Sequence, residues 1–444
     1  MIIFSCYTIL VIMTLYVIIT AVTIIKKTSS LILAVPVLIM YFWTLYGAWS
    51  FIPLKLAGGS IYYEDIMFRV HIDEYYLESL VLYSLFIVIF AEFMKSIARH
   101  KVYITNVEHK QQIANYKLYI NRLNDSGSYT VIVCLFLFVF VYFSSTNLLL
   151  AISQGVSAYT LSRFNSALGS AGSLVTFAGD TFLYLSIPLL FVGKMWKRYV
   201  VIISILLYFM INALLGNRNT LLCGMIIGVL LTTEIWGIKK IFNPKAITVA
   251  VLVFAGIQAI SIVRGLSVND IISGNYSLDL FDVFGSLSNS NEKYAAHISM
   301  YGVLKNDVPF TYGSSILALI STFIPTFMGV QRADDIYHYY VLHTMQFKPD
   351  IGVTLHHAAG WYMNFGLIGV VCGALLWGYV MKWLYSKRLK FIYFYGSILF
   401  ASVTIQMIRG GGLESYKGVL LMDTLIPMLI IYYCSKNRSK RLCK

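Results

Sequence analysis

Three arginines in this sequence stand where predicted apolar helices end, and each has a glycine or an asparagine as a neighbour. They are Arg218, Arg264 and Arg409. A guanidinium group offers a planar fork of N–H donors that fits the oxygens of a phosphate. A cation at a helix C-terminus also complements the helix dipole, which would explain any one of them. Three arginines in the same position at a membrane edge favour ligand binding over dipole pairing alone. They predict a pyrophosphate site at the membrane surface.

Residues beside two of these arginines add candidate ligand contacts. Asn217 precedes Arg218, and a helix predicted to begin at Asn219 would point its free backbone N–H groups at the same region. Three glycines after Arg409 let the backbone turn sharply and come close to a ligand. The candidate substrate-binding residues of these two stretches are Asn217, Gly410, Glu414, Tyr416 and Lys417, of which the glutamate is also expected to hold the arginine in place.

The composition is that of an integral membrane protein. Of the 444 residues, 58% are hydrophobic and 12% are charged, whereas about a quarter of the residues of a soluble domain are charged. The six cysteines lie in apolar runs or in the C-terminal tail, without the spacing of a zinc site or a disulfide framework. The net charge of +14 comes from loops between apolar runs, so no nucleic acid partner is expected.

The apolar runs predict an all-α, polytopic protein with a single transmembrane domain over residues 1–444. A helix needs about 20 apolar residues to cross a bilayer, and on that measure the chain has about 11 such runs. The runs are residues 2–25, 31–53, 77–97, 129–145, 172–194, 199–216, 219–237, 246–263, 360–381, 391–408 and 418–434.

The basic residues predict the orientation of these helices. Most of the 34 lysines and arginines fall in alternate loops, which places the N-terminus outside and the C-terminus inside. Most acidic residues then fall on the outer face. The largest extracytoplasmic loop covers residues 264–360. Within it the apolar segment 310–329, interrupted by Pro325, is predicted to be re-entrant or interfacial.

Five short motifs, in order between residues 200 and 434, resemble those of the Wzy-type polymerases that build O-antigen, enterobacterial common antigen and capsule from repeat units. The first half of the chain matches that family in hydropathy alone. The motifs are Gly216-Asn217-Arg218-Asn219, Arg264-Gly265, Phe323-Ile324-Pro325, the stretch from Trp361 to Gly369, and the stretch from Arg409 to Tyr416.

The resemblance implies an inverting glycosyltransferase in the bacterial cytoplasmic (inner) membrane. Such an enzyme moves a growing glycan from undecaprenyl pyrophosphate onto the non-reducing end of an incoming lipid-linked repeat unit, on the extracytoplasmic face. The implied partners are undecaprenyl-pyrophosphate-linked glycans, and a chain-length regulator and a flippase are candidate protein partners in the membrane. No cofactor is expected, and three fixed cations make a metal unnecessary.

Each step of this reaction has candidate residues. Stabilisation of the departing pyrophosphate is assigned to the three arginines. The base for the acceptor hydroxyl is left open among four side chains that are all expected on the extracytoplasmic side of the membrane, namely Glu292, His356, His357 and Glu414. Family members often carry an acid where this chain has its histidine pair, so the identity of the base is open.

Further polar and aromatic residues are candidates for substrate contacts. Arg332 and His338 lie in a polar cluster of the outer loop that is expected to bind the acceptor, and Trp361 is a candidate to stack on a sugar face. Asp180 and Asp423 lie within predicted helices. Ionisable groups inside a membrane are functional candidates, although pairing with an arginine would equally explain these two.

Three other functions compete with this interpretation. A metal-dependent transferase that uses a polyprenyl monophosphate donor would need an early acidic pair, such as Glu64-Asp65 or Asp73-Glu74. A ligase that attaches O-antigen to lipid A core would use a similar arginine-bearing site. A lipid or polysaccharide transporter would need charges through the membrane midplane, and no charged track crosses the predicted helices.

Overall fold

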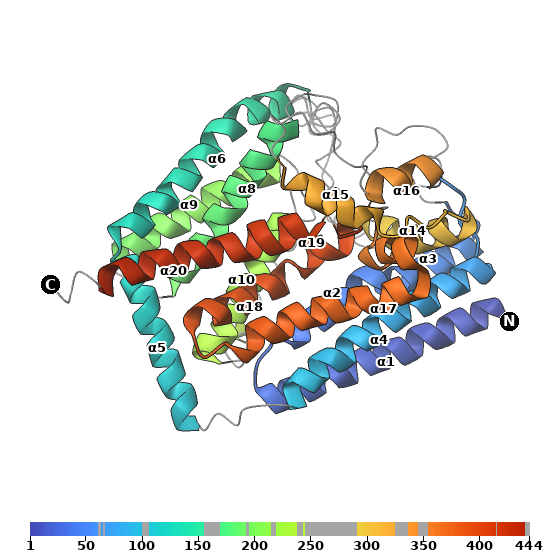
Figure 1. Cartoon of the computed structure of the whole chain (residues 1–444), viewed down its shortest axis with the longest axis horizontal. Helices are drawn as coiled ribbons and strands as arrows, with labels where there is room; N and C mark the ends of the chain where they lie inside the picture. Colours follow the sequence, from blue (N-terminus) through green and yellow to red (C-terminus); the bar gives the residue numbers. More distant parts are fainter. Residues whose placement is uncertain are drawn as a thin grey trace. The chain divides into compact units, whose positions relative to one another are not determined.

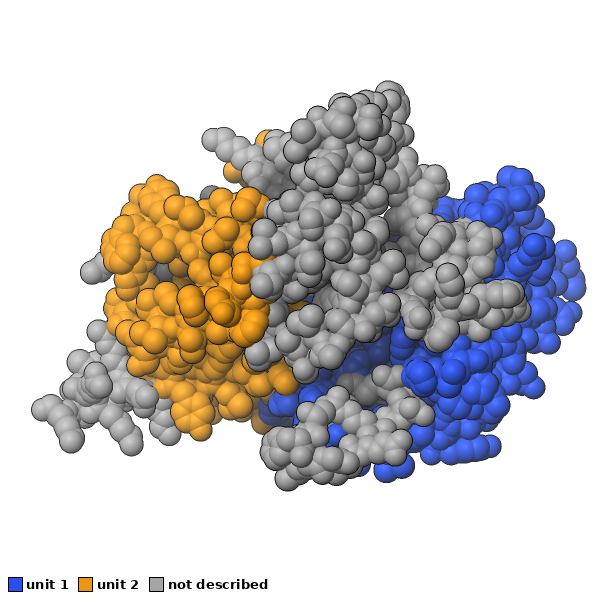
Figure 2. Space-filling view, turned by 90° about the horizontal axis from the view of Figure 1, so that it is seen from above, with its two compact units in different colours: residues 1–102, 290–384, 403–421 blue, residues 103–289, 385–402, 422–444 orange. Residues whose placement is uncertain are grey.

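The computed structural model is helical throughout the part of the chain that it describes. The described residues are 1–60, 64, 67–99, 106–154, 169–191, 195–214, 219–237, 243–244, 291–324, 336–344, 354–413 and 415–439. They divide into two compact units, coloured separately in Figure 2. Unit 1 comprises residues 1–102, 290–384 and 403–421, and unit 2 comprises residues 103–289, 385–402 and 422–444.

Unit 1 is built on long N-terminal helices joined by short helices from later in the chain. Helix α1 packs against α2 and α4, and α2 in turn contacts α14 and α19. In Figure 1 the blue helices α1 and α4 run side by side. The helices of this unit are α1 (Ile2–Thr28), α2 (Ala34–Thr44), α3 (Tyr46–Leu56), α4 (Glu74–Arg99), α14 (Asn291–Lys305), α15 (Ser314–Thr322), α16 (Ile336–Thr344), α19 (Thr404–Arg409) and most of α17 (His357–Ser386).

Unit 2 pairs α6 with α8 and α9, while α10 packs against α18. Helix α10 begins at Asn219, where the sequence predicted a helix start. A π-helix, η5 (Lys417–Leu425), carries the chain from unit 1 into unit 2. The other elements are α5 (Asn106–Asn124), α6 (Gly127–Gln154), α8 (Gly169–Ser186), η2 (Ile187–Leu190), α9 (Met195–Leu214), α10 (Asn219–Trp236), α18 (Phe391–Ser402) and α20 (Ile426–Ser439).

Seven helical segments in the described part are long and apolar enough to cross a membrane. They are Ile2–Thr28, Ala34–Leu56, Glu74–Arg99, Gly127–Ser145, Met195–Asn212, His357–Ser386 and Lys417–Ser435. Three shorter apolar helices coincide with the predicted runs 172–194, 219–237 and 391–408, and the run 246–263 lies outside the described residues. The polytopic, all-helical prediction is therefore confirmed, whereas the count of about 11 spans and the orientation stay predictions.

Large apolar side chains are exposed on several of these helices. Ile19 of α1 is 63% exposed, Phe138 of α6 is 66% exposed, and Ile203 of α9 is 66% exposed. Continuous exposed apolar surface is rare on a soluble protein. It is the expected surface of a helix that faces lipid, because the hydrocarbon core solvates apolar groups and excludes polar ones.

Helix α17 contains a break that the apolar run 360–381 did not predict. Phe365 has φ −142° and Gly366 has φ 58° and ψ −142°, a combination that glycine adopts far more readily than other residues. The first turns then fold back on the rest of the helix. A Cβ added at Gly369 would lie 2.0 Å from the carbonyl oxygen of Trp361, and one added at Gly373 would lie 2.5 Å from its ring. Both glycines therefore make room for this tryptophan.

The described part of the predicted segment 310–329 contains α15, which has nine residues. At a rise of about 1.5 Å per residue, such a helix is too short to cross a bilayer. The backbone N–H of Thr311, just before this helix, donates to the carbonyl oxygen of Met363 at 2.8 Å. The segment therefore packs on the start of α17, and its later residues, 325–329, lie outside the described part.

Candidate active site

Arg409 is the last residue of α19, and unit 1 places an aromatic ring and a hydroxyl beside its guanidinium group. The guanidinium carbon lies 5.7 Å from the centroid of the Trp43 ring. One terminal nitrogen, Nη2, lies 3.5 Å from Oγ1 of Thr354. The residue is partly exposed, so these contacts orient the cation without removing it from the surface. A cation held in this way is preorganised to receive an anionic group.

The glycines after Arg409 are held against the start of α17. Gly410 forms a parallel bridge with Leu355, and the N–H of Gly411 donates to the carbonyl oxygen of Leu355 at 2.9 Å. Gly411 has φ 73°, a backbone conformation that suits glycine. A Cβ added at Gly360 would lie 2.7 Å from the carbonyl carbon of Gly411. Two glycines from distant parts of the chain thus let the backbone segments touch.

His356 is completely buried, and both of its ring nitrogens are engaged. Its Nε2 lies 2.9 Å from Oγ1 of Thr44, and its Nδ1 accepts a hydrogen bond from the backbone N–H of Ala358 at 3.0 Å. Its own backbone N–H donates to Oγ of Ser299 at 3.0 Å. Partners from α2, α4 and α14 hold the ring in the core of unit 1.

A second buried histidine, His297 of α14, extends this network. Its Nδ1 lies 2.8 Å from the backbone oxygen of Thr44, and its Nε2 lies 2.7 Å from the hydroxyl of Tyr76. Thr44 therefore contacts both histidines, one through its backbone oxygen and one through its hydroxyl. The hydrogen-bonded chain from Tyr76 to His356 joins α4, α14 and α2 to the segment that carries Leu355.

The partners of both rings fit their neutral forms. Nδ1 of His297 faces a carbonyl oxygen, so it carries the proton and donates, while Nε2 accepts from Tyr76. Nδ1 of His356 accepts, so Nε2 carries the proton and donates to Thr44. Burial lowers the pKa of His297 to about 4. Burial, and then the neighbouring histidines, lower the pKa of His356 well below its ordinary value.

These two histidines predict a loss of stability in mild acid. An unfolded histidine titrates near pH 6.5, whereas these two buried rings stay neutral to a lower pH. The unfolded chain therefore binds more protons than the folded one as the pH drops from about 6.5 towards 4. The free energy of unfolding falls over that range. At pH 5 each ring costs about 2 kcal/mol of unfolding free energy. Thermal unfolding in detergent at pH 7.5 and pH 5 measures the loss.

His297→Asn keeps a donor for the Thr44 carbonyl and removes one titrating group, so this variant should lose less stability between the two pH values. His343→Asn, at an exposed position on α16, should behave like the unaltered protein. An unchanged pH dependence in His297→Asn would contradict the assignment.

His357 is also completely buried. Its Nε2 accepts a hydrogen bond from the indole N–H of Trp361 at 2.9 Å and lies 3.2 Å from the hydroxyl of Tyr416. Tyr416 is buried and packs edge-on against Trp377 of α17. His357, Trp361 and Tyr416 therefore join the start of α17 to the residues that follow the three glycines.

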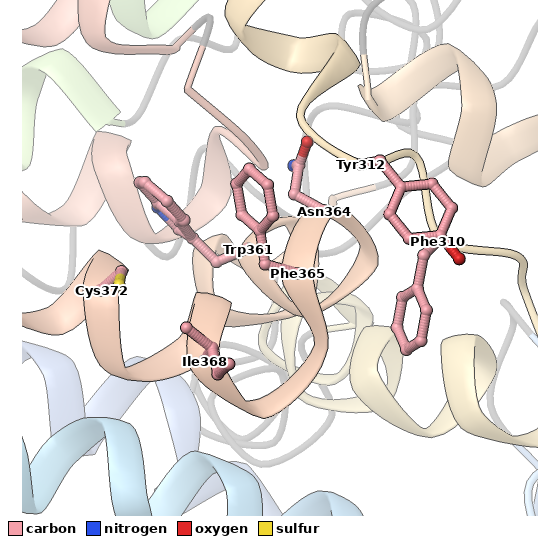
Figure 3. A pocket seen from close by; sticks show the side chains of 7 residues that line it. All are labelled: Phe310, Tyr312, Trp361, Asn364, Phe365, Ile368 and Cys372. Atoms are coloured by element: carbon pink, nitrogen blue, oxygen red, sulfur yellow. The ribbon is translucent and has the colours of Figure 1, made fainter.

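A pocket of about 660 Å³ lies beside the break in α17 (Figure 3). Asn364 closes one side of it. Its Oδ1 accepts hydrogen bonds from the hydroxyls of Thr311 and Ser315 at 3.1 and 3.0 Å, and its Nδ2 donates to the backbone oxygen of Gly360 at 2.8 Å. The pocket is lined by Phe310, Tyr312, Trp361, Asn364, Phe365, Ile368 and Cys372.

The structure brings several of the predicted site residues together in unit 1. Arg409 and Gly410 lie at the bridge to Leu355, and Lys417 lies with its ammonium nitrogen 5.6 Å from the ring centroid of Phe323. His338 is exposed on α16. The predicted residues Asn217, Arg218, Arg264, Arg332 and Glu414 lie outside the described residues, as does the side chain of Glu292, whose backbone lies in the first turn of α14.

The early acids have structural partners. Glu64 pairs with Lys55 at 2.8 Å and accepts a hydrogen bond from the backbone N–H of Val70. Asp73 caps α4 through the N–H of Tyr76 and accepts a hydrogen bond from the hydroxyl of Tyr301. Within the described residues, no three His, Cys, Asp or Glu side chains gather to hold a metal ion.

In unit 2, Asp180 and Asp423 are both buried. The hydroxyl of Tyr208 donates to Oδ1 of Asp180 at 3.0 Å. The hydroxyl therefore satisfies part of the hydrogen-bonding capacity of this carboxyl group within the helical core. This contact gives Asp180 a structural role inside unit 2, and the sequence had left such a role open.

Sequence reasoning missed Trp43, Thr44 and His297, which surround the arginine and the histidine pair. Nothing in the local sequence singles them out, because 253 positions separate Thr44 from His297 and isolated threonine and tryptophan residues in apolar runs are common. Gly360 directly precedes the motif that begins at Trp361 and was not itself singled out. Its contact with Gly411 appears only when the two segments meet.

Comparison with known families identifies the family of this chain. A family model described as O-antigen polysaccharide polymerase Wzy matches residues 1–441, nearly the whole chain. Neither the curated proteins nor the solved structures contain a match. The match covers the first half of the chain as well, which the short motifs did not reach.

Proposed function

The chain belongs to the O-antigen polysaccharide polymerase family, and from this membership we propose that it joins lipid-linked oligosaccharide repeat units into longer glycans. The lipid carrier is undecaprenyl pyrophosphate, and the reaction takes place on the extracytoplasmic face of the bacterial inner membrane. The growing glycan leaves its pyrophosphate carrier and is transferred to the incoming repeat unit with inversion at the anomeric carbon.

The observation that carries this proposal is the placement of Arg409. Its guanidinium group is oriented by Trp43 and Thr354, and the backbone after it is held against Leu355. Negative charge develops on the departing pyrophosphate as the glycosidic bond breaks. A cation that is already oriented stabilises that charge without reorganising, which is the main source of catalysis in many transfer reactions. Arg218 and Arg264 are proposed to share this role.

The acceptor hydroxyl also needs a base. Both nitrogens of His356 serve the core network, and Nε2 of His357 accepts from Trp361, so we assign these histidines to positioning the segment that holds the glycines. Glu292 and Glu414 are then the candidates for the base. The metal-dependent alternative is disfavoured, because the oxygens of Glu64 and Asp73 are used to hold unit 1 together.

Reconstitution tests the function directly. The purified protein, placed in liposomes with undecaprenyl-pyrophosphate-linked repeat units from its host, should convert them into a ladder of products on a glycan gel. Deletion of the gene should remove the ladder from cells and leave a single repeat unit. Transfer of one unit to lipid A core, with no ladder, would identify a ligase and overturn the proposal.

A further inference from the structure

The pocket beside the break in α17 has walls that are fixed by the fold. The conformation of Gly366 sets the break, and Asn364 is held by three hydrogen bonds from its side chain. Ring contacts join Trp361 to Phe365. A volume of about 660 Å³ is within the usual range of preformed ligand sites. The pocket is therefore an open hollow whose floor is set by the fold, with Tyr312 and Ile368 exposed at its edge.

The lining of this pocket suits an apolar occupant. The amide of Asn364 is used in its bonds to Thr311, Ser315 and the carbonyl of Gly360. The indole N–H of Trp361 donates to His357. These polar atoms serve the protein, and a sugar would need them for its hydroxyl groups. Aromatic rings and aliphatic side chains make up most of the remaining lining.

The pocket adjoins the segment that carries Arg409. Gly360 lies against Gly411, with 2.7 Å between its added Cβ and the carbonyl carbon of that residue, and the next residue, Trp361, lines the pocket. In a lipid diphosphate, the first carbons of the hydrocarbon chain follow directly on the phosphate. A diphosphate bound at Arg409 would therefore place the start of its chain near this pocket.

We propose that this pocket receives the first isoprenoid units of the carrier lipid while the diphosphate is bound at Arg409. The inference rests on the proposed function for the identity of the lipid. The occupant is a polyprenyl chain, and a phospholipid acyl chain is the alternative that the experiment must distinguish. The walls contact the occupant through dispersion forces. Selectivity for the isoprenoid over an acyl chain therefore depends on how well the methyl branches fit the lining.

Photo-crosslinking tests this assignment without requiring polymerisation. The full-length protein is placed in nanodiscs of phosphatidylethanolamine and phosphatidylglycerol with a polyprenyl phosphate that carries a diazirine on an isoprene unit near the phosphate. After irradiation, the labelled residues are mapped by mass spectrometry. The label is expected within residues 361–372, and excess undecaprenyl phosphate should prevent it, whereas added phosphatidylglycerol should not.

A filled pocket provides the matched comparison. Ile368 lines the pocket and is 71% exposed, so Ile368→Trp should fill it and abolish the label. Leu376, on the same helix and 38% exposed, lies outside the lining, and Leu376→Trp should keep the label. Label that persists in Ile368→Trp, or that phosphatidylglycerol removes equally well, would overturn the inference.

The same measurement separates this inference from the proposed function. Arg409→Ala should be labelled more weakly in the pocket, because the phosphate that positions the chain loses its cation. A wild-type protein that is labelled in the pocket but forms no ladder would contradict the proposed function alone. A protein that forms the ladder but takes up no label in the pocket would contradict the isoprenoid assignment alone.

Discussion

Arg409→Ala is expected to reduce repeat-unit polymerisation about 100-fold or more while the protein remains folded. The guanidinium group is partly exposed and packs on Trp43 and Thr354, so its removal takes little from the core. Under the proposed function, it also removes the cation that we assign to stabilising the departing pyrophosphate. Reconstituted polymerisation rates at saturating substrate, together with size-exclusion profiles, measure the two effects separately.

Arg409→Lys should recover little of this activity. Lysine keeps the charge but loses the planar fork that binds two phosphate oxygens and stacks on an aromatic ring. Arg388→Ala is the matched control, because Arg388 also packs on an aromatic ring, with its guanidinium carbon 3.9 Å from the centroid of Tyr385. Its loop is predicted to face the cytoplasm. Full polymerisation by Arg409→Ala would remove this arginine from the mechanism.

Gly360→Ala is expected to lower polymerisation about tenfold or more, although it adds only a methyl group. The new Cβ would lie 2.7 Å from the carbonyl carbon of Gly411 and 2.9 Å from the backbone nitrogen of Gly412. Both are backbone atoms, so the segment after Arg409 must move to relieve the clash. A displacement approaching 1 Å at a catalytic group can cost about 100-fold in rate. The polymerisation rate of Gly360→Ala measures the effect of this shift.

Gly228→Ala provides the control for this substitution. Gly228 lies within α10, and a Cβ added there would meet nothing within 4 Å, so the helix should gain slightly in stability and polymerisation should not change. If Gly360→Ala polymerises as fast as Gly228→Ala, the contact between the start of α17 and the glycine segment does not position the site. Limited proteolysis of folded Gly360→Ala, with Gly228→Ala beside it, shows whether the segment after Arg409 is released.

Local features of the chain were sufficient to predict the class of protein. The first apolar run, 2–25, was predicted as a helix and the structure has α1 at Ile2–Thr28. A sharp turn at the glycines after Arg409 was also predicted, and Gly411 has φ 73° there; the approach of this segment to a ligand stays a prediction. Apolar length and residue type are properties of a short stretch, so they can be recognised without knowing what the stretch packs against.

The surroundings of these residues were decided by tertiary structure. Both histidines of the 356–357 pair were candidates for the base, and both are buried inside unit 1, where Nε2 of His356 contacts Thr44 and Nε2 of His357 accepts from Trp361. The break at Gly366 was missed, because a straight helix and a helix that folds back can have the same apolar sequence pattern. Charge and hydropathy patterns are written along the chain, whereas hydrogen-bond partners and close backbone contacts depend on which distant segments meet.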